Sequence, residues 1–511
     1  MYSSALTHFN AGRHAQAKQE LKKVLATDPR HAGALHLAGL IAYRQQQYRE
    51  AAALIGSAIA LQPDSRMYCN LALVDLAQAR PEEAIEHCRQ SLLLQPEQFD
   101  AHYNMGLACQ SMGDLDRAEA CYRKSLEQDS ANARALNNLG VVLEARGRSQ
   151  EAVSAFAQAI DCQSDFAMAH YNLAISRDTL GDYGGAVSSY RHTLKLQPDN
   201  ASAHNNLGVA LKNLRLFPEA ADSYRQAVRL QPGFADAHQN LGDVLAILGS
   251  TDEAIASHRK AITLQWDREP VKDRYTRKIE TQAARHTLLE ARSLLTGAGI
   301  RFFPYAGTLL GLVRDGDILP HDKDLDIALS WEEDRDAVLH ALTAPGRFVC
   351  PGRDSLTEAD KTWYINVHHA DTRVDLDLFF MQPDGKHFLV GVKSHQRSTL
   401  SRPRRFQLRP FTWQGVDWLI PDPPEGLLAE LYGPGWHKPD PDFDTVVSSN
   451  CLTEESRPWR RCHGYSRLYS QLRSGQMNKV RAYCRQLLKL HPDDPFLREL
   501  CEKLADPVQD P

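Results

Sequence analysis

The sequence predicts an α-solenoid over residues 1–266, an α/β domain over residues 299–460 and a short helical tail over residues 461–511. Three observations support this prediction. Small residues recur every 33 or 34 positions in the first half. Short segments with alternating acidic residues follow in the second half, and a helical apolar pattern comes after them. A charged linker and a connecting helix are expected between the two parts, over residues 267–298.

The composition is that of an ordinary globular protein. The 511 residues are 43% apolar and 24% charged, with a net charge of -5, which argues against wholesale disorder, nucleic-acid binding and an anionic membrane. We see neither a secretory signal nor a long apolar run, so no transmembrane segment and a cytoplasmic location are predicted. The ten cysteines form no CxxC pairs, so neither a zinc site nor a disulfide framework is indicated, which fits a reducing compartment.

The first half repeats with a fixed period. One small position recurs as Ala17, Ala51, Ala84, Ala118, Ala152, Ala186, Ala220 and Ala254. A second recurs as Gly39, Ala72, Gly106, Gly140, Ala174, Gly208 and Gly242. We expect each repeat to be two antiparallel helices that approach most closely at these positions. One helix pair cannot bury its apolar faces alone, so the repeats should stack into a superhelix with a concave groove.

This pattern, with strings such as YNMGLACQSMGDLDRAEACYRKSLEQD, resembles the tetratricopeptide repeat (TPR) over about residues 1–266, in eight repeats. The resemblance implies a fold that binds partners and has no chemistry of its own. We therefore expect a protein partner in the groove.

Asparagines recur two residues before the second small position: Asn70, Asn104, Asn138, Asn172, Asn206 and Asn240. They predict a ladder along the concave face. Their amides donate and accept hydrogen bonds, which suits the backbone of an extended polypeptide. Two alternatives stay open, namely that the ladder only stabilises the stack or that the groove takes another ligand. The array also resembles that of O-linked N-acetylglucosamine transferases, which carries an asparagine ladder. Four histidines lie two residues before ladder asparagines and are expected to flank the groove: His102, His170, His204 and His238.

The densest chemistry of the second half begins near residue 305. Gly307 and Thr308 form a turn into a short helix, where free N–H groups and a hydroxyl suit a phosphate, and Arg314 lies at the far end of this helix. The segment 321–329 then alternates as a strand does. One of its faces should carry three carboxylates, Asp322, Asp324 and Asp326.

A third acidic segment, residues 372–380, puts Asp375 and Asp377 on one strand face. Two hard carboxylates one pleat apart suit Mg²⁺ or Mn²⁺, and a carboxylate from a neighbouring strand would complete the site. That third carboxylate could also accept the proton of an attacking hydroxyl. The alternatives are a solvated acidic edge strand and a structural role for Asp375 or Asp377.

Three strings together resemble the nucleotidyltransferase-fold group that contains the LicD phosphocholine transferases and the fukutin-type sugar phosphotransferases. They are AGTLLGLVRDGDILPHDKDLDIAL, VDLDLFF and IPDPPEGLLAELYGPGWHKPDPDFD. The resemblance implies transfer of a phospho-alcohol unit from a CDP-activated donor to a hydroxyl, usually of a glycan, with release of CMP. It implies the catalytic and metal-binding acids Asp324, Asp326 and Asp377. The implied donor-phosphate residues are Gly307 and Thr308, and Asp322 matches a further family acid that either contacts the site directly or supports it. Arg314, from its place on the helix, could also reach a phosphate.

The sequence departs from the family pattern at a few positions. His321 and Lys323 stand where the family often has an aromatic residue and another acid, and Phe380 stands where it often has proline. Lys323 should point away from the metal face. A basic stretch from His395 to Arg409 is either a second phosphate clamp or a solvated loop. The tail string KVRAYCRQLLKLHPDDP looks like a degenerate half-repeat, which we interpret as a cap or a docking element and not as a site.

The sequence thus predicts a two-part enzyme. A LicD-type phosphotransferase domain transfers a phosphate-linked group, and the array docks a protein partner or the acceptor. Two alternatives remain: the acceptor is a polypeptide held in the groove, or the transferase domain is inactive and the protein is an adaptor. The donor alcohol, the acceptor and the oligomeric state stay open.

Overall fold

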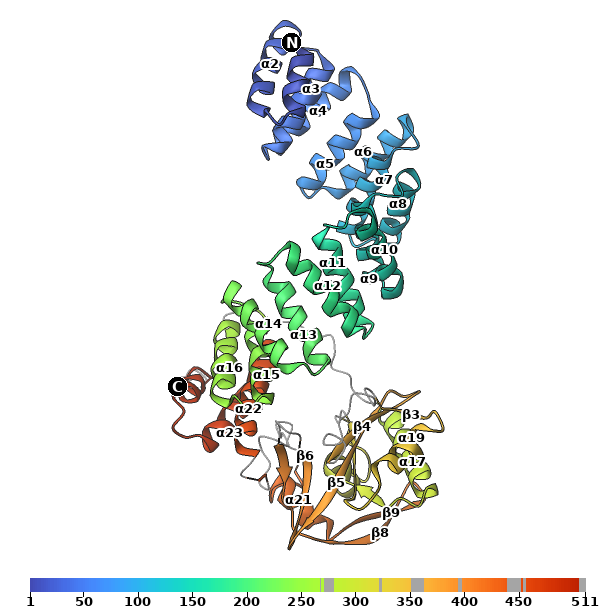
Figure 1. Cartoon of the computed structure of the whole chain (residues 1–511), viewed down its shortest axis with the longest axis vertical. Coiled ribbons are helices and arrows are strands. Elements are labelled where there is room, and N and C mark those ends of the chain that lie inside the picture. The colour runs from blue at the N-terminus through green and yellow to red at the C-terminus, as the bar shows by residue number, and fades with distance from the viewer. Residues whose placement is uncertain are drawn as a thin grey trace, which may run out of the picture. The chain divides into compact units, whose positions relative to one another are not determined.

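The computed structural model describes residues 1–266, 268–270, 280–320, 324–350, 363–393, 398–438, 452–453 and 456–504. The chain forms two compact units, Met1–Arg215 and Leu216–Pro511. Its first half is the predicted TPR solenoid, a mixed α/β domain follows, and helices return at the end (Figure 1). The described residues include no helix with the length and apolar character needed to cross a membrane.

Helices of 9 to 16 residues fill the solenoid. The first unit contains α1 (Tyr2–Asn10), α2 (His14–Thr27), α3 (Ala32–Arg44), α4 (Tyr48–Leu61), α5 (Ser65–Ala77), α6 (Pro81–Leu94), α7 (Phe99–Ser111), α8 (Leu115–Gln128), α9 (Ala133–Ala145), α10 (Ser149–Cys162), α11 (Ala167–Thr179), α12 (Tyr183–Leu196) and α13 (Ala201–Asn213). The second unit begins with α14 (Phe217–Leu230), α15 (Ala235–Ile247) and α16 (Thr251–Trp266). Within the first unit, neighbouring helices pack as pairs, as predicted.

The small residues of the repeat lie where the two helices of a pair touch. A Cβ atom on Gly106 would lie 2.7 Å from the ring of Tyr122, and one on Gly140 would lie 2.6 Å from the ring of Phe156. Such distances leave no room for a side chain. The prediction that the second small position marks the closest approach is therefore confirmed.

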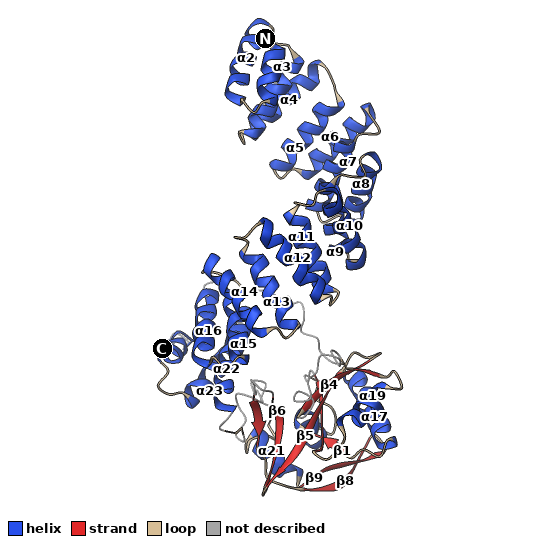
Figure 2. Cartoon of the chain, viewed as in Figure 1, coloured by secondary structure: helices blue, strands red, loops and turns tan. Residues whose placement is uncertain are grey.

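The α/β domain begins with α17 (Thr281–Gly297) and is built on a seven-stranded sheet (Figure 2). The strands are β1 (Phe302–Pro304), β2 (Asp324–Ser330), β3 (Phe348–Val349), β4 (Tyr364–His369), β5 (Asp375–Asp384), β6 (His387–Lys393) and β7 (Ser398–Ser401). The order is β1-β2-β5-β4-β3, with β6 between β5 and β7. Only β2 and β5 run parallel among the pairs described, and a separate ribbon joins β8 (Gln407–Trp413) to β9 (Val416–Asp422).

Alternation along the strands separates a core face from an acidic face. Leu325, Ile327 and Leu329 of β2 belong to one apolar cluster with α17 and α19 (Arg335–Thr343), two helices that lie side by side (Figure 1). Ala328, from the opposite face of β2, belongs to a second cluster with α18 (Ala306–Arg314) and α21 (Pro424–Tyr432). The period of two therefore directs Asp324 and Asp326 toward the side of α18.

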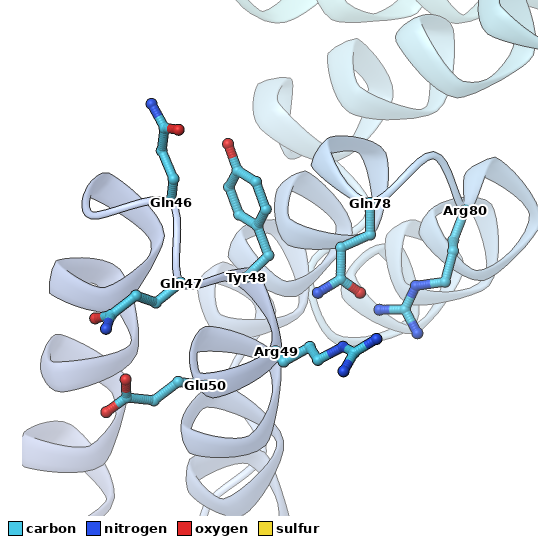
Figure 3. Close-up of a pocket in the computed structure, with 7 residues that line it drawn as sticks. All are labelled: Gln46, Gln47, Tyr48, Arg49, Glu50, Gln78 and Arg80. Atoms are coloured by element: carbon cyan, nitrogen blue, oxygen red, sulfur yellow. The ribbon is translucent and has the colours of Figure 1, made fainter.

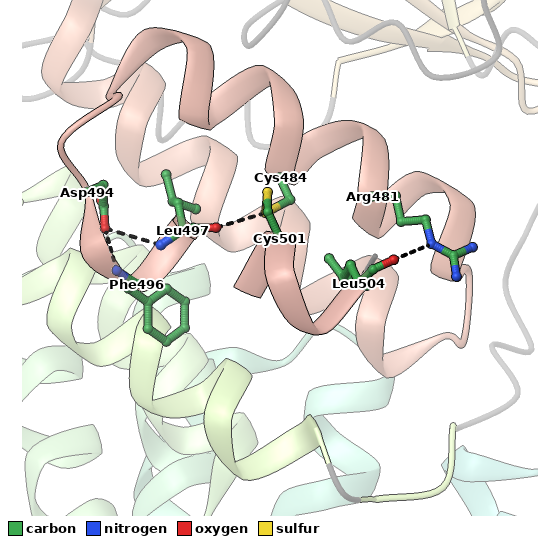
Figure 4. Close-up of a disulfide and its surroundings, with 7 residues drawn as sticks. All are labelled: Arg481, Cys484, Asp494, Phe496, Leu497, Cys501 and Leu504. Carbon is green, nitrogen blue, oxygen red and sulfur yellow. Dashed lines mark hydrogen bonds between the residues drawn. A yellow bond between two sulfur atoms is a disulfide. The ribbon is translucent and has the colours of Figure 1, made fainter. Parts of the chain in front are cut away.

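Three helices end the described chain: α22 (Arg457–Arg473), α23 (Met477–Leu490) and α24 (Pro495–Leu504). The predicted helical tail is present, although α22 begins four residues before position 461. Cys484 of α23 and Cys501 of α24 form a disulfide with a Cα–Cα distance of 6.2 Å (Figure 4). This local bridge, unexpected from the sequence, fastens α24 to α23. A hydrogen bond from Arg481 Nε to the Leu504 carbonyl, 3.0 Å, fastens the end of α24 as well.

Candidate functional site

The parallel pairing of β2 and β5 brings the predicted acidic residues together. Asp324 is the register partner of Asp375, and Asp326 is the register partner of Asp377. All four lie on the same face because residues two apart along a strand point the same way. Asp326 and Asp377 are the inner pair, each with 9% of its surface exposed, whereas Asp375 is exposed.

The start of α18 holds Asp326 in place. The Gly307 N–H donates to Asp326 Oδ2 over 3.0 Å, and the Asp326 N–H donates to Thr308 Oγ1 over 2.8 Å. The Tyr305 N–H donates to the Asp326 carbonyl over 3.0 Å. A carboxylate at a helix N-terminus is stabilised by such N–H groups. The helix therefore orients one of the predicted metal-binding acids.

The structure places Gly307 and Thr308 differently from the predicted turn before a helix. Both lie inside the first turn of α18 and not in a turn before it. The Thr308 side chain is fully buried, and its hydroxyl is engaged with the Asp326 backbone. Its role in the described structure is thus to position Asp326. Direct binding of donor phosphates by Gly307 and Thr308 stays a prediction.

Asp377 is held by two residues of β4 that the sequence reasoning missed. Tyr364 donates its hydroxyl to Asp377 Oδ1 over 2.9 Å, and Asn366 donates its amide to the same oxygen over 2.7 Å. Burial raises the pKa of Asp377 to about 6, and the nearby carboxylates of Asp324 and Asp375 add to this effect. The alternation of Tyr364 and Asn366 in the string TWYINVHH was the signal that could have revealed them.

Arg314 lies at the end of α18, as predicted. Its guanidinium forms two hydrogen bonds with the neighbouring Asp315, of 2.8 and 2.9 Å, which raise the pKa of Arg314. Its role in phosphate binding stays a prediction. Asp322, together with His321 and Lys323, lies outside the described residues.

Three arginines of the candidate second clamp are paired with carboxylates, and Arg405 donates to the Gly385 carbonyl over 3.4 Å. Arg402 pairs with Asp384 at 2.7 Å, and Arg404 pairs with Glu430 at 3.4 Å. Arg409 lies 3.3 Å from Asp422, while His395 and Arg397 lie outside the described residues. These pairs favour the solvated loop over a phosphate clamp.

The acidic face carries the carboxylates that are predicted to bind a hard divalent cation. Asp326 and Asp377 come from adjacent strands in register, and Asp377 takes its hydrogen bonds from neutral groups while like charges lie nearby. Partly buried carboxylates this close repel one another unless a cation balances them. Carboxylate oxygens are the ligands that Mg²⁺ and Mn²⁺ prefer. Metal binding by Asp324, Asp326 and Asp377 stays a prediction, because among the described residues these three side chains do not bring ligand atoms within 4.8 Å of one another.

Among the described residues, His286, Glu290 and His369 do bring three possible ligand atoms within 4.8 Å of one another. Glu290 accepts two hydrogen bonds from Arg347, of 2.5 and 3.0 Å, and one of 2.6 Å from His369 Nε2. His369 Nδ1 accepts the N–H groups of Asp371 and Thr372. Nε2 must then carry the proton, so it is a donor and not a free ligand. This network joins α17 to β4.

The asparagine ladder forms hydrogen bonds between successive repeats. Asn104 donates to the Cys69 carbonyl over 3.2 Å, and Asn172 donates to Asn137 Oδ1 over 3.0 Å. The remaining described links join Asn70 to His36, Asn138 to Tyr103 and Asn206 to Tyr171. The partner lies 34 or 35 positions earlier, in the preceding repeat. This geometry favours the alternative in which the ladder stabilises the stack.

The histidines near the ladder also make internal contacts. The rings of His204 and His238 each hydrogen-bond, at 3.1 Å, to the carbonyl six positions earlier, on Pro198 and Pro232. His170 contacts the Ser164 carbonyl in the same way at 3.0 Å. They therefore fasten their repeats to the loops before them.

A separate open hollow of about 800 Å³ lies over two turns of the first unit. Arg49 and Arg80 contribute to its lining, which contains no predicted site residue (Figure 3).

Comparison with known proteins agrees with both halves of this architecture. Models of the tetratricopeptide repeat match residues 8–72, 63–127, 97–165, 171–233 and 210–269. The model described as LicD/FKTN/FKRP, nucleotidyltransferase domain, matches residues 299–422. No curated protein matches the chain.

Several solved structures resemble part of the chain. They include MamA from Desulfovibrio magneticus RS-1, with 20% identity over 33% of this chain and 96% of that chain and a TM-score of 0.32. YrrB, titled a TPR protein with an unusual peptide-binding site, has 26% identity over 36% and 95%, with a TM-score of 0.33. PilF of Pseudomonas aeruginosa has 23% identity over 39% and 91%, with a TM-score of 0.36.

The family matches support two general conclusions about function. The LicD match places the α/β domain in a transferase-type family, and the repeats are of a kind that serves protein interaction. The chain therefore joins tetratricopeptide repeats, matched within residues 8–269, to a domain matched by the LicD/FKTN/FKRP nucleotidyltransferase model over residues 299–422.

Proposed function

We propose that the protein is a metal-dependent transferase that moves a phospho-alcohol unit from a CDP-activated donor to a hydroxyl, most simply of a glycan. The observation that carries this proposal is the parallel register of Asp326 and Asp377, two partly buried carboxylates on one face. The family match supports transfer chemistry, and the carboxylates supply the ligands that such chemistry needs.

In this proposal, each acidic residue of the cluster has its own role. Asp324, Asp326 and Asp377 would hold Mg²⁺ or Mn²⁺, which would supply charge neutralisation on the donor pyrophosphate and its leaving nucleotide. The start of α18 keeps Asp326 oriented. The acceptor oxygen forms a bond to the phosphorus of the phospho-alcohol unit, and the bond to the CMP oxygen breaks. The exposed carboxylate of Asp375 can take the proton of the acceptor hydroxyl.

The proposed role of the array is to dock a protein partner or the acceptor, in the cytoplasm. A polypeptide acceptor is the second candidate, because the repeats are of a kind that binds proteins. Because the described ladder amides donate to neighbouring repeats, recognition would rest on other groups of the groove. An inactive adaptor is disfavoured by the intact acidic cluster.

Release of CMP from a panel of CDP-linked alcohols tests the proposal. We expect the full-length protein to release CMP in the presence of Mg²⁺ or Mn²⁺ and an acceptor, and to lose this activity with a chelator. A labelled product that migrates with glycan supports the first acceptor, and one that migrates with protein supports the second. Absence of release with every donor, alongside tight peptide binding, would favour the adaptor.

A further inference from the structure

One oxygen of Asp377 is already saturated by its neighbours. Oδ1 accepts both the Tyr364 hydroxyl and the Asn366 amide. A carboxylate oxygen offers two lone-pair sites, so these two donors use both of them. Among the described residues, Asp377 Oδ2 receives no hydrogen bond, which leaves this oxygen available to a cation.

The two donors are themselves fixed. Tyr364 and Asn366 are two residues apart on β4, which pairs antiparallel with β5, and Asn366 is the direct register partner of Asp377. The Tyr364 ring packs against Phe379 with its centroid 5.3 Å away. A donor held by backbone pairing and ring packing loses little freedom when it binds its acceptor. The pair therefore sets the rotation of the Asp377 carboxylate.

We infer that Tyr364 and Asn366 are positioning residues that turn Asp377 Oδ2 toward the cation shared with Asp324 and Asp326. The inference rests on the proposed metal-dependent function. Groups that hydrogen-bond to metal-binding side chains orient them, and their removal typically lowers metal affinity by about 10- to 100-fold. β4 thus contributes to the site although it carries no acidic residue there.

Mn²⁺ binding to the full-length protein, measured by calorimetry without donor, tests this inference. We expect Tyr364→Phe and Asn366→Leu each to raise the Kd for Mn²⁺ by about 10-fold or more. Tyr122→Phe is the matched control, since it removes a buried hydroxyl that donates to Gln110 over 2.7 Å in the array. That control should lower thermal stability and leave Mn²⁺ binding unchanged.

The outcomes separate the inference from the proposed function. A Kd within about twofold of the wild type in both folded variants overturns the inference, as does a wild-type protein that binds no Mn²⁺. Wild-type binding that weakens in both variants supports the inference even if no CDP-linked donor reacts, in which case only the proposed function fails. Asn366→Ser, which keeps a donor, should recover part of the lost affinity.

A separate observation concerns α22 and α23, which follow the spacing of the repeats. In the array, Gly181 with φ +80° forms the turn between two helices, and Pro198 follows 17 positions later. In the tail, Gly475 with φ +73° forms the turn between α22 and α23, and Pro492 follows at the same distance. The family models for the repeat end at residue 269, so the repeat-like spacing of α22 and α23 lies outside the matched residues.

The contacts of α22 reproduce those between repeats. It packs on α15 and α16, and Gln239 of α15 donates to Ser466 of α22 over 2.7 Å. Gln239 occupies the same position of its repeat as Asn137, three residues before the second small residue. Asn137 accepts a hydrogen bond from Asn172, the ladder asparagine of the next repeat. Ser466 therefore stands in the place of a ladder asparagine.

A polar network closes this junction. Asp494, just before α24, accepts two hydrogen bonds of 2.7 Å from Arg259 of α16, one of 2.5 Å from Tyr465 and one of 3.0 Å from Arg461. Burial acts against ionisation of Asp494, but these donors bring its pKa down to about 2. The carboxylate also accepts the Phe496 N–H at the start of α24.

From these observations the structure assigns α22 and α23 as a ninth repeat with α24 as its cap, so that the catalytic domain is an insertion between repeats eight and nine. The domain is then attached at both ends. On the tail side, the Ser456 hydroxyl accepts the Leu400 N–H of β7 over 2.9 Å, just before α22. The predicted half-repeat becomes a full one.

Hydrogen exchange of the full-length protein tests the ninth repeat. We expect α15, α16, α22 and α23 to open as one cooperative group, and Asp494→Asn to raise exchange about 10-fold or more in all four helices. Asp493→Asn is the matched control, because the Asp493 side chain is fully exposed whereas that of Asp494 is 1% exposed. Exchange that rises only in α22 to α24 in the Asp494→Asn protein would overturn the assignment.

Discussion

Asp326 of β2 and Asp377 of β5 face the same side of a parallel strand pair, and a different element orients each carboxylate. Asp326 is held by the first turn of α18, and Asp377 is held by β4. Each support precedes its strand in the chain, α18 before β2 and β4 before β5, so the geometry of the cluster depends on several elements of the domain and not on one motif.

The first prediction concerns the charge of Asp326. Asp326→Asn keeps the size of the side chain and an oxygen for the Gly307 N–H, but removes the negative charge. We expect CMP release to fall by about 100-fold or more, with the melting temperature nearly unchanged. Asp336→Asn, on the exposed part of α19, serves as the control and should keep wild-type activity. Wild-type turnover in Asp326→Asn would refute the site.

The second prediction concerns the ladder. Asn104 is buried and donates to the Cys69 carbonyl, so Asn104→Ala should lower the free energy of unfolding of the array by about 1 kcal/mol. Denaturation of the full-length protein, followed by circular dichroism, measures this change. Asn213→Ala, at an exposed position of α13, should change it far less. An unchanged midpoint together with weakened peptide binding would restore the polypeptide-binding role of the ladder.

The third prediction concerns helix approach in the repeats. Gly140→Ala would push a methyl group into the ring of Phe156 and should destabilise the array by about 1–3 kcal/mol. Gly184→Ala, where a Cβ meets nothing within 4 Å, should be neutral or stabilising by up to about 1 kcal/mol. Thermal unfolding of the two variants compares them directly, and equal melting temperatures would contradict the close approach.

The fourth prediction concerns pH. Hydrogen bonds from Arg347, and then from His369, lower the pKa of Glu290 from 4.5 to about 2. The stabilisation from ionised Glu290 is therefore complete above about pH 4.5 and is lost as the pH falls toward about 2. Glu290→Gln should lower the melting temperature at pH 6, and the difference from the wild type should shrink between pH 4.5 and 3. A difference that stays constant over this range would show that charge is not involved.

Much of this fold could be predicted from local patterns. The 34-residue period and the small residues predicted the helix pairs, because a close contact such as that of Gly140 with Phe156 recurs at Gly39, Gly106 and Gly242. Alternation predicted that Asp326 and Asp377 each lie on one strand face. Their adjacency came from the resemblance to a family, since strand order is a long-range property that alternation cannot give.

What the sequence could not supply were the partners of these groups. Asn104 looked equally suited to a peptide and to the next repeat, and only the stacking distance decides between them. Thr308 looked like a phosphate ligand because a hydroxyl at a helix start suits either role, and burial directs it to the Asp326 backbone. The place of Asp494 among Arg259, Arg461 and Tyr465 joins segments more than 200 positions apart, which no local pattern reveals.

The attachment of the inserted α/β domain at both of its ends has a consequence for engineering. Elsewhere in the array, the connection from Leu230 to Ala235 is a short loop, and the insertion occupies the corresponding place between Trp266 and Arg457. That place is a grafting point. A different enzyme with neighbouring termini could be exchanged into it, and the same repeat array would then carry a new chemistry.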